Sequence, residues 1–193
     1  MTTTAPYSTL SALSPLDGRY AAKTDKLRPI LSEAGFMHHR VKVEISWLLA
    51  LSQAGFAEIK PFSTNATALL EHMATDFTET DAARIKAIEA VTNHDVKAVE
   101  YWLKEQVKDV PELVAATEFI HFACTSEDIN NTSHGMMLKA ARDGVMLPAL
   151  QGLVDKLTRS PTPTRPCRCF RAPTVRRQAR LPWAKKWPTW WRA

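Results

Sequence analysis

The 193-residue sequence contains only three cysteines and six glycines. It also has no run of about 18 apolar residues. The missing apolar run argues against a membrane-spanning helix and a membrane partner. Three cysteines are too few for a disulfide framework, so we expect a reducing, cytoplasmic setting. Cys167 and Cys169 form a C-x-C pair without a second pair, and the histidines are not spaced with other ligands. No metal site is therefore predicted.

The sequence also lacks a glycine-rich phosphate loop and the G-x-S-x-G motif of serine hydrolases. If the chain handles an anionic ligand, other groups must hold it. Arginine, histidine, hydroxyl groups and the free backbone N–H groups of helix N-termini are the remaining means of doing so.

Acidic residues are absent from one part of the chain. Residues 159–193 carry ten Lys and Arg and no Asp or Glu, with half of the prolines and four of the six tryptophans. Residues 1–158 therefore have a net charge of −5, although the whole chain has +5. The two parts differ so much in composition that we treat them as separate objects. We expect the tail to be disordered.

Residues 1–158 are rich in Ala, Leu, Glu and Lys, and their apolar residues recur at helical spacing, which predicts an all-α fold. Gly55 is predicted to end the longest early helix, Ser63 to cap the next, and Pro148 to kink the last. The predicted helices cover Glu33 to Gln53, Ser63 to His72, Thr80 or Asp81 through Val91, Asp95 to Lys108, a short stretch through Phe119 and Ile120, and Glu127 to Leu157.

The last predicted helix is about 30 residues, or about 45 Å, long, which exceeds what a small domain needs. Such a helix is typical of a bundle, and the sequence supplies no antiparallel partner for it by this interpretation. We therefore expect residues 1–111 to form a small N-terminal helical domain. Residues 112–158 would begin a long-helix bundle, truncated here, and residues 159–193 would form the basic tail.

Three polar clusters interrupt the apolar helices. The first, Ser14–Tyr20, places an arginine beside a tyrosine at a turn, where a guanidinium can bind a carboxylate or phosphate. The second, Thr92–Val96, places His94 at a helix N-terminus. The third, Thr125–Asn131, places two hydroxyl groups at the start of the long helix. Taken singly, the first cluster is better explained as a solvated turn and the second as an ordinary cap provided by Asn93 or Asp95. The third also fits an ordinary cap, provided by Thr125 or Ser126, and a cap and an anion site are compatible there.

Taken together and in this order, the clusters resemble those of the adenylosuccinate lyases, which belong to the fumarase/aspartase superfamily. The matching stretches read SPLDGRY, TNHDVKAVEY and EFIHFACTSEDINN, and the resemblance covers residues 8–158. It implies an all-α lyase fold, a homotetramer, and active sites formed by segments of three subunits. It also implies a carbon–nitrogen lyase of purine biosynthesis that needs no cofactor.

The resemblance assigns roles to particular residues. Arg19 and Tyr20 match a pair that contacts the nucleotide, and Asn93, His94 and Asp95 match a second substrate-binding segment. His94 would lie near the substrate's phosphate or assist proton transfer. Thr125 and Ser126 match a third segment, which holds the succinyl or phosphate end.

The implied reaction is a β-elimination that releases fumarate from adenylosuccinate and from the succinylated imidazole-carboxamide nucleotide. A base removes a proton next to a carboxylate, and an acid protonates the leaving nitrogen. The family's acid motif, S-R-T-H-G-Q, and its base loop, S-S-x-M-P-x-K-x-N-P, are both absent. We therefore expect little or no turnover from this chain alone.

Two interpretations of the tail remain open. The tail could be the product of a frame shift in the coding sequence. Tryptophan has a single codon, so translating the stretch from Trp183 to Trp191 in another frame fixes several residues. The result is compatible with G-K-E-M-A-N-V-V, which resembles a helix. Alternatively, ten positive charges interleaved with tryptophan could bind nucleic acid, which we consider the weaker interpretation.

Three competing functions also remain open. The chain could derive from a superfamily lyase acting on argininosuccinate, fumarate or aspartate. It could be a nucleic-acid-binding module or a non-catalytic interaction fragment.

Overall fold

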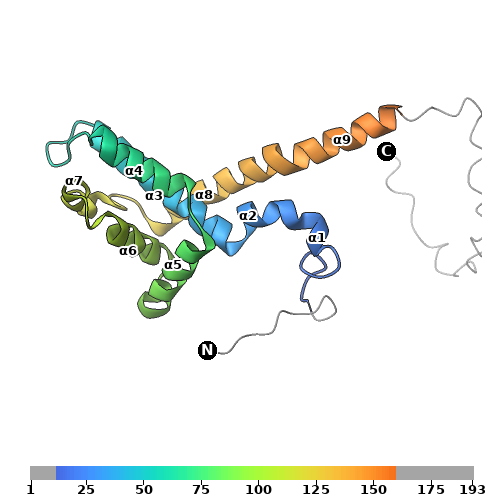
Figure 1. Ribbon diagram of the computed structural model, residues 1–193, viewed down its shortest axis with the longest axis horizontal. Coiled ribbons are helices and arrows are strands. Elements are labelled where there is room, and N and C mark those ends of the chain that lie inside the picture. The colour runs from blue at the N-terminus through green and yellow to red at the C-terminus, as the bar shows by residue number, and fades with distance from the viewer. Residues whose placement is uncertain (1–11, 160–193) are drawn as a thin grey trace, which may run out of the picture. The chain divides into compact units, whose positions relative to one another are not determined.

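The structure, a computed structural model, describes residues 12–159 (Figure 1). All regular elements in this range are helical, which confirms the all-α fold. They are α1 (Ala21–Thr24), the 3₁₀ turn η1 (Asp25–Leu27), α2 (Arg28–Leu31), α3 (Glu33–Gln53), α4 (Thr64–Thr75), α5 (Glu79–Thr92), α6 (Asp95–Val107), α7 (Pro111–Val114), the 3₁₀ turn η2 (Thr117–Phe119), α8 (Ser126–Ala141), the π-helical segment η3 (Arg142–Met146) and α9 (Leu147–Arg159).

Side-chain caps explain most helix boundaries. The Ser32 and Ser63 hydroxyls accept hydrogen bonds from the first turns of α3 and α4, so both helices begin where the sequence predicts. The chain leaves α3 through Gly55, whose φ of +83° suits a residue without a Cβ. The predicted start of α5 at Thr80 is one residue late, because the helix begins at Glu79. Thr78 caps α5 in a reciprocal pair with Asp81.

The apolar core lies between α3 and the helices α4, α5 and α6. From α3 it receives Val41, Ile45 and Leu48, each almost fully buried. Their partners are mainly aliphatic and include one large aromatic residue; they are Leu70, Ile85, Val99, Trp102 and Leu103. Phe77 packs edge-on against Trp102, with 5.6 Å between ring centroids.

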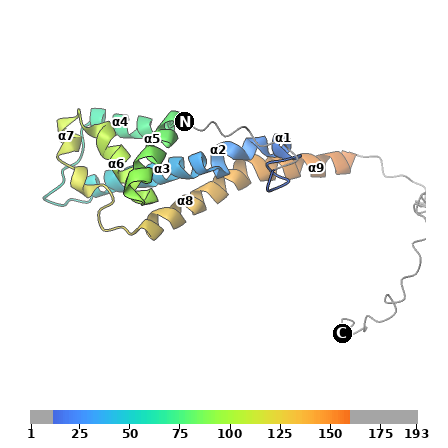
Figure 2. The ribbon, with the colours of Figure 1, turned by 90° about the horizontal axis from the view of Figure 1, so that it is seen from below.

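A different side of α3 packs along α8, and the two helices lie side by side (Figures 1 and 2). They run antiparallel, because Phe36 stacks on His134 while Arg40, further along α3, bonds to Asn130, which is earlier in α8. The expectation that the sequence supplies no antiparallel partner for the long helix is therefore wrong for its first half. Apolar residues on α3 mark its core side, but the α8 contact depends on polar residues that the pattern does not reveal.

The predicted long helix is interrupted before Pro148. Proline has no N–H to donate and its ring crowds the carbonyl four residues earlier. The chain forms the wider turn η3 here, and the Leu147 N–H bonds to the Arg142 carbonyl. In α9 the apolar residues are exposed at helical spacing; they are Leu147, Leu150, Leu153, Val154 and Leu157.

The chain separates into two units, Met1–Gly152 and Leu153–Ala193, and only residues 153–159 of the second are described. Arg159, assigned to the tail from its composition, is the last residue of α9. The expectations of disorder, a shifted frame or nucleic-acid binding concern residues 160–193 and lie outside the described residues. The domain boundary at Pro111, where α7 begins, stays a prediction.

Gly35 provides a test of how closely α2 and α3 pack. A Cβ at this position would lie 2.5 Å from the Ile30 carbonyl oxygen, whereas one at Gly135 in α8 would meet nothing within 4 Å. We expect Gly35→Ala to lower the free energy of unfolding by about 1–3 kcal/mol through overpacking. Gly135→Ala should raise it by up to about 1 kcal/mol, because alanine is the better helix former. Urea unfolding followed by circular dichroism measures both, and equal effects would contradict the close packing.

Candidate functional site

The second and third polar clusters meet at one corner of the molecule. His94 immediately precedes α6 and Ser126 is the first residue of α8, yet His94 Nε2 lies 3.5 Å from Ser126 Oγ. Both side chains stand at helix N-termini, where unpaired backbone N–H groups and the helix dipoles favour negative charge. The fold therefore brings together two segments that are 32 residues apart in the sequence.

The orientation of His94 follows from the local backbone. Asn93 ends α5 with a φ of +52°, a left-handed conformation that asparagine tolerates well. His94 then becomes extended, and its Nδ1 accepts a 3.1 Å hydrogen bond from the Lys97 N–H. The prediction that Asn93 or Asp95 caps α6 is wrong, because His94 is the cap. An accepting Nδ1 leaves the neutral ring's proton on Nε2, the atom facing Ser126.

In the third cluster the two hydroxyl groups have different positions. Thr125 caps α8 in a reciprocal arrangement with Asp128, whose carboxylate accepts from the Thr125 N–H at 2.8 Å and from its hydroxyl at 2.9 Å. These hydrogen bonds hold the pKa of Asp128 below its ordinary value. With Thr125 as the cap, the Ser126 hydroxyl is directed to the His94 side.

Arg40 joins both clusters to α3. Its side chain is only 6% exposed, and its guanidinium bonds to Asp95 and, at 2.9 Å, to Asn130 Oδ1. The guanidinium also lies over the Phe36 ring, 3.9 Å from the centroid. Sequence reasoning missed this residue. The available signal was an arginine at helical spacing from Phe36, near the apolar side of a long helix.

Asp95 is oriented inward by this contact. Burial acts to raise its pKa, but the Val96 N–H and the Arg40 guanidinium outweigh it, so the pKa of Asp95 lies below its ordinary value. Its carboxylate is therefore engaged within the protein. The same holds for Asp128, so two of the acids at this corner have their charge partly balanced internally.

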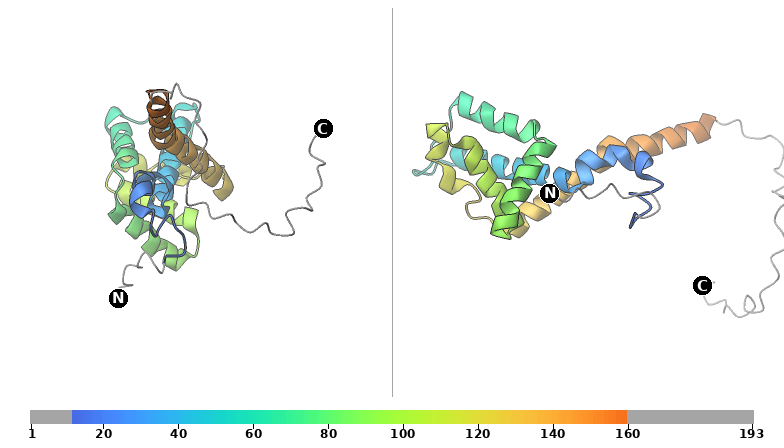
Figure 3. Two further views of the ribbon diagram at one scale, coloured as in Figure 1. Left: turned by 90° about the vertical axis from the view of Figure 1, so that its right-hand side faces the viewer. Right: turned by 60° about the horizontal axis from the view of Figure 1, so that its bottom comes forward.

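The first cluster is not part of this corner. Arg19 lies over the Tyr20 ring at 4.7 Å, and the hydrogen bonds and ion pair of the segment Ser14–Tyr20 connect it with the adjoining turn, Thr24 and Arg28. Helix α1, which follows this segment, lies well apart from the turn between α5 and α6 (Figures 1 and 3). The chain by itself does not bring Arg19 and Tyr20 to His94 and Ser126.

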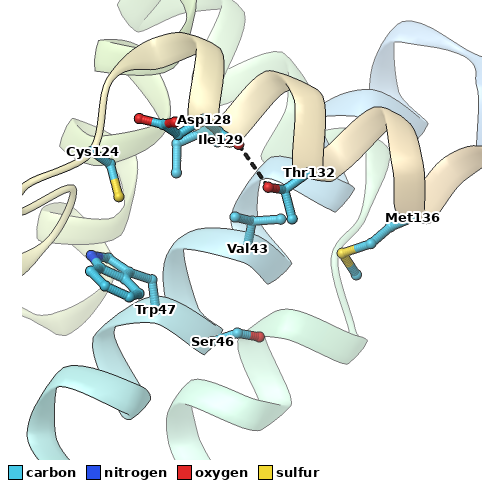
Figure 4. Close-up of a pocket in the computed structure, with 8 residues that line it drawn as sticks. All are labelled: Val43, Ser46, Trp47, Cys124, Asp128, Ile129, Thr132 and Met136. Carbon is cyan, nitrogen blue, oxygen red and sulfur yellow. Dashed lines mark hydrogen bonds between the residues drawn. The ribbon is translucent and has the colours of Figure 1, made fainter. Parts of the chain in front are cut away.

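His121, to which the sequence assigned no role, forms a 2.6 Å hydrogen bond with the fully buried Glu44. The neighbouring Cys124 lines a hollow of about 310 Å³ between α3 and α8, together with Trp47, Val43 and Met136 (Figure 4). Burial raises the pKa of the Cys124 thiol, and the Glu44 and Asp128 carboxylates add to this effect. The thiol is therefore a poor nucleophile near neutral pH.

Comparison with known proteins places the chain in a family. The family model described as "Lyase" matches residues 18–162. The chain belongs to this lyase family. It is similar to adenylosuccinate lyases of Haemophilus influenzae (60% identical over 153 residues, 79% of this chain), Vibrio cholerae (57% over 151 residues, 78%) and Escherichia coli (56% over 149 residues, 77%). These matches cover 34%, 33% and 33% of the relatives, so the lyase chain spans about a third of their length.

Within the described part of the lyase chain, no group of three or more His, Cys, Asp or Glu is placed to hold a metal ion. No helix between residues 12 and 159 is both long and apolar enough to cross a membrane. The corner at His94 and Ser126 instead offers an imidazole, a hydroxyl and two helix N-termini. Such an arrangement can bind an anion and donate or relay a proton.

Replacing Arg40 tests its connecting role in the lyase chain. Lysine has a single ammonium group and cannot reproduce the planar fork that reaches both Asp95 and Asn130. We expect Arg40→Lys to reduce the free energy of unfolding by about 1–3 kcal/mol and to increase hydrogen exchange at the starts of α6 and α8. Arg84→Lys is the matched control, because Arg84 pairs with Glu105 on the exposed surface. A larger loss in the control would contradict this role for Arg40.

The lowered pKa of Asp95 leads to a pH prediction. A carboxyl group with a depressed folded-state pKa contributes its full stability above its unfolded pKa of about 4 and loses it as the pH falls further. Thermal unfolding of the lyase chain should therefore show a midpoint that drops between about pH 4 and 2. Asp95→Asn should flatten this drop, and identical slopes in the two proteins would contradict the assignment.

Proposed function

We propose that the whole protein of which residues 8–158 form the N-terminal part is an adenylosuccinate lyase. It would release fumarate from adenylosuccinate and from the succinylated aminoimidazole carboxamide ribonucleotide. The names of the similar proteins support this, as does the match to the lyase family. The observation that carries the proposal is the meeting of His94 and Ser126 at two helix N-termini tied together by Arg40.

The chemistry of the substrate fits this corner. Adenylosuccinate carries a phosphate and two carboxylates, and the Ser126 hydroxyl and nearby backbone N–H groups can donate hydrogen bonds to such oxygens. The His94 Nε2–H would donate to an anionic oxygen or transfer its proton during the elimination. Asn93 and Asp95 would set the position of His94, and Thr125 that of Ser126. Acid–base elimination of this kind requires no cofactor.

Other subunits would complete the site. The Arg19–Tyr20 segment lies apart from the corner within one chain, and the motifs for the acid and the base are absent from this sequence. We propose a homotetramer in which Arg19 and Tyr20 of one subunit contact the nucleotide bound at His94 and Ser126 of another. We also propose a cytoplasmic location, which a role in purine biosynthesis favours.

A chimera tests the proposal. Residues 8–158 would replace the corresponding third of the Escherichia coli relative, which then supplies the remaining two thirds. We expect the chimera to cleave adenylosuccinate, measured by the loss of its ultraviolet absorbance, while the 193-residue chain alone does not. In the chimera, His94→Gln should reduce kcat/KM by about 10²–10⁴-fold, the usual contribution of a general acid or base.

His72→Gln is the control for that substitution, because His72 is 71% exposed on α4 and should leave the activity unchanged. Two results would reject the proposal. One is a folded, tetrameric chimera that ignores adenylosuccinate but cleaves argininosuccinate or fumarate. The other is a chimera in which His94→Gln has no more effect than His72→Gln.

A further inference from the structure

A buried contact joins α3 to residues 120–125, the loop that leads into α8. The Glu44 side chain on α3 has no exposure to solvent, and its Oε1 accepts a 2.6 Å hydrogen bond from His121 Nδ1. Its second oxygen, Oε2, is buried without a hydrogen-bond partner in the described part of the chain. A buried carboxyl group with an unpaired oxygen destabilises a fold. Its presence therefore suggests a role other than stability.

The loop has a backbone that needs external support. His121 and Ala123 have φ values of +64° and +58°. Residues with a Cβ rarely adopt this left-handed conformation, and it persists where surrounding contacts impose it. Two such contacts come from α3. Glu44 holds His121, and the Trp47 indole N–H donates a 2.8 Å hydrogen bond to the Phe122 carbonyl. Figure 4 shows Trp47 and Cys124 facing each other across the hollow between α3 and α8.

The loop determines where α8 begins. It ends at Thr125, the cap of α8, and the next residue is Ser126, whose hydroxyl lies 3.5 Å from His94 Nε2. His94 is held separately, through its own bond to Lys97 and through the contact of Arg40 with Asp95. A shift of the loop would therefore move Ser126 relative to His94.

We infer that Glu44 is a positioning residue of the proposed site, which holds His121, fixes the 120–125 loop and so sets Ser126 beside His94. The inference rests on the proposed function only where it concerns the ligand, and the geometry of the loop does not depend on that function. Burial raises the pKa of Glu44 although the His121 hydrogen bond acts in the opposite direction, which agrees with a group retained for geometry at a cost in stability. Glu100, on α6, also acts to raise the pKa of Glu44.

The test compares loop order with global stability in the full 193-residue chain. Glu44→Leu removes the buried carboxylate together with its unpaired oxygen, and the His121 ring that it leaves is 20% exposed and can bond to water, so the free energy of unfolding should change by no more than about 1 kcal/mol. Hydrogen exchange at the amides of Phe122, Cys124 and Thr125 should nevertheless rise by about 10-fold or more, while α6 amides change little. Glu44→Gln, which keeps an oxygen for His121 Nδ1–H, should restore slow exchange in the loop.

Leu48→Ala is the matched control on α3. Leu48 is buried in the core, so its loss should speed exchange throughout α3, α5 and α6 without a preference for the loop. Trp47→Phe, at a partly exposed position, removes the indole hydrogen bond to the Phe122 carbonyl and should also speed exchange in the loop. A Glu44→Leu chain with unchanged loop exchange, or with a rise as uniform as that of Leu48→Ala, would overturn the inference. If Glu44→Leu does not fold, hydrogen exchange of the loop in Glu44→Gln and Trp47→Phe tests the inference instead. Loop exchange in Trp47→Phe that is as slow as in the unmodified chain would then overturn the inference.

Inorganic phosphate provides a second readout, followed by the amide NMR shifts of His94 and Ser126. Glu44→Leu should weaken phosphate binding by about 10-fold or more, and Glu44→Gln should recover most of it. A merely structural role would instead lower stability and phosphate affinity together. If the unmodified chain gives no shifts with phosphate, the anion-binding part of the proposed function fails. The exchange experiment still decides the role of Glu44, and the nitrogen shift of His121 Nδ1 reports directly whether the bond is present.

Discussion

The guanidinium of Arg40 is a positive charge placed almost entirely out of solvent, so the fold must supply oxygen ligands around it. Those ligands are Asp95, the first residue of α6, and Asn130, in the first turns of α8. Because the Arg40 guanidinium binds both of these residues, the N-termini of α6 and α8 lie close to the same point on α3. His94 and Ser126 are neighbours of these ligands in the sequence, and their proximity follows. The corner exists because the charge of Arg40 has to be compensated there.

The structure shows which kinds of information a single sequence carries. The bounds of α3 and the start of α4 were predictable, because Ser32, Ser63 and Gly55 act on residues a few positions away. The start of α5 and the cap of α6 were misassigned because several neighbouring residues can cap a helix, and the backbone conformation of the folded chain decides which of them does so. The bonds from Arg40 to Asn130 and from Glu44 to His121 cross 90 and 77 positions, and no local pattern encodes them. The polar clusters of the site were visible in the sequence, whereas the residues that hold them together were not.

Several features of this fold are unfavourable to its stability. Glu44 is buried with one unpaired oxygen, and His121 and Ala123 have left-handed backbones without being glycine. Each of these features is unfavourable in isolation and costs on the order of 1–3 kcal/mol. These three features lie on the path from α3 to the first turn of α8. A series of such features, next to the meeting of two polar clusters, is expected when geometry at a site is favoured over stability.

The proposed site would also be incomplete within one chain, because of how the helices are arranged. Arg19 and Tyr20 lie in the turn that leads into α1, whereas His94 and Ser126 lie at the N-termini of α6 and α8, so no local adjustment joins them. At the same time α9 exposes leucines at helical spacing, and burying a leucine fully contributes about 1.5–3 kcal/mol. In the proposed tetramer, association through long helices would thus be driven by apolar burial, and the polar segments of different chains would be brought together as a consequence. If the proposed tetramer forms, apolar helices would drive its assembly and polar helix ends would bind the substrate, so that no single chain would need to concentrate positive charge around a polyanion.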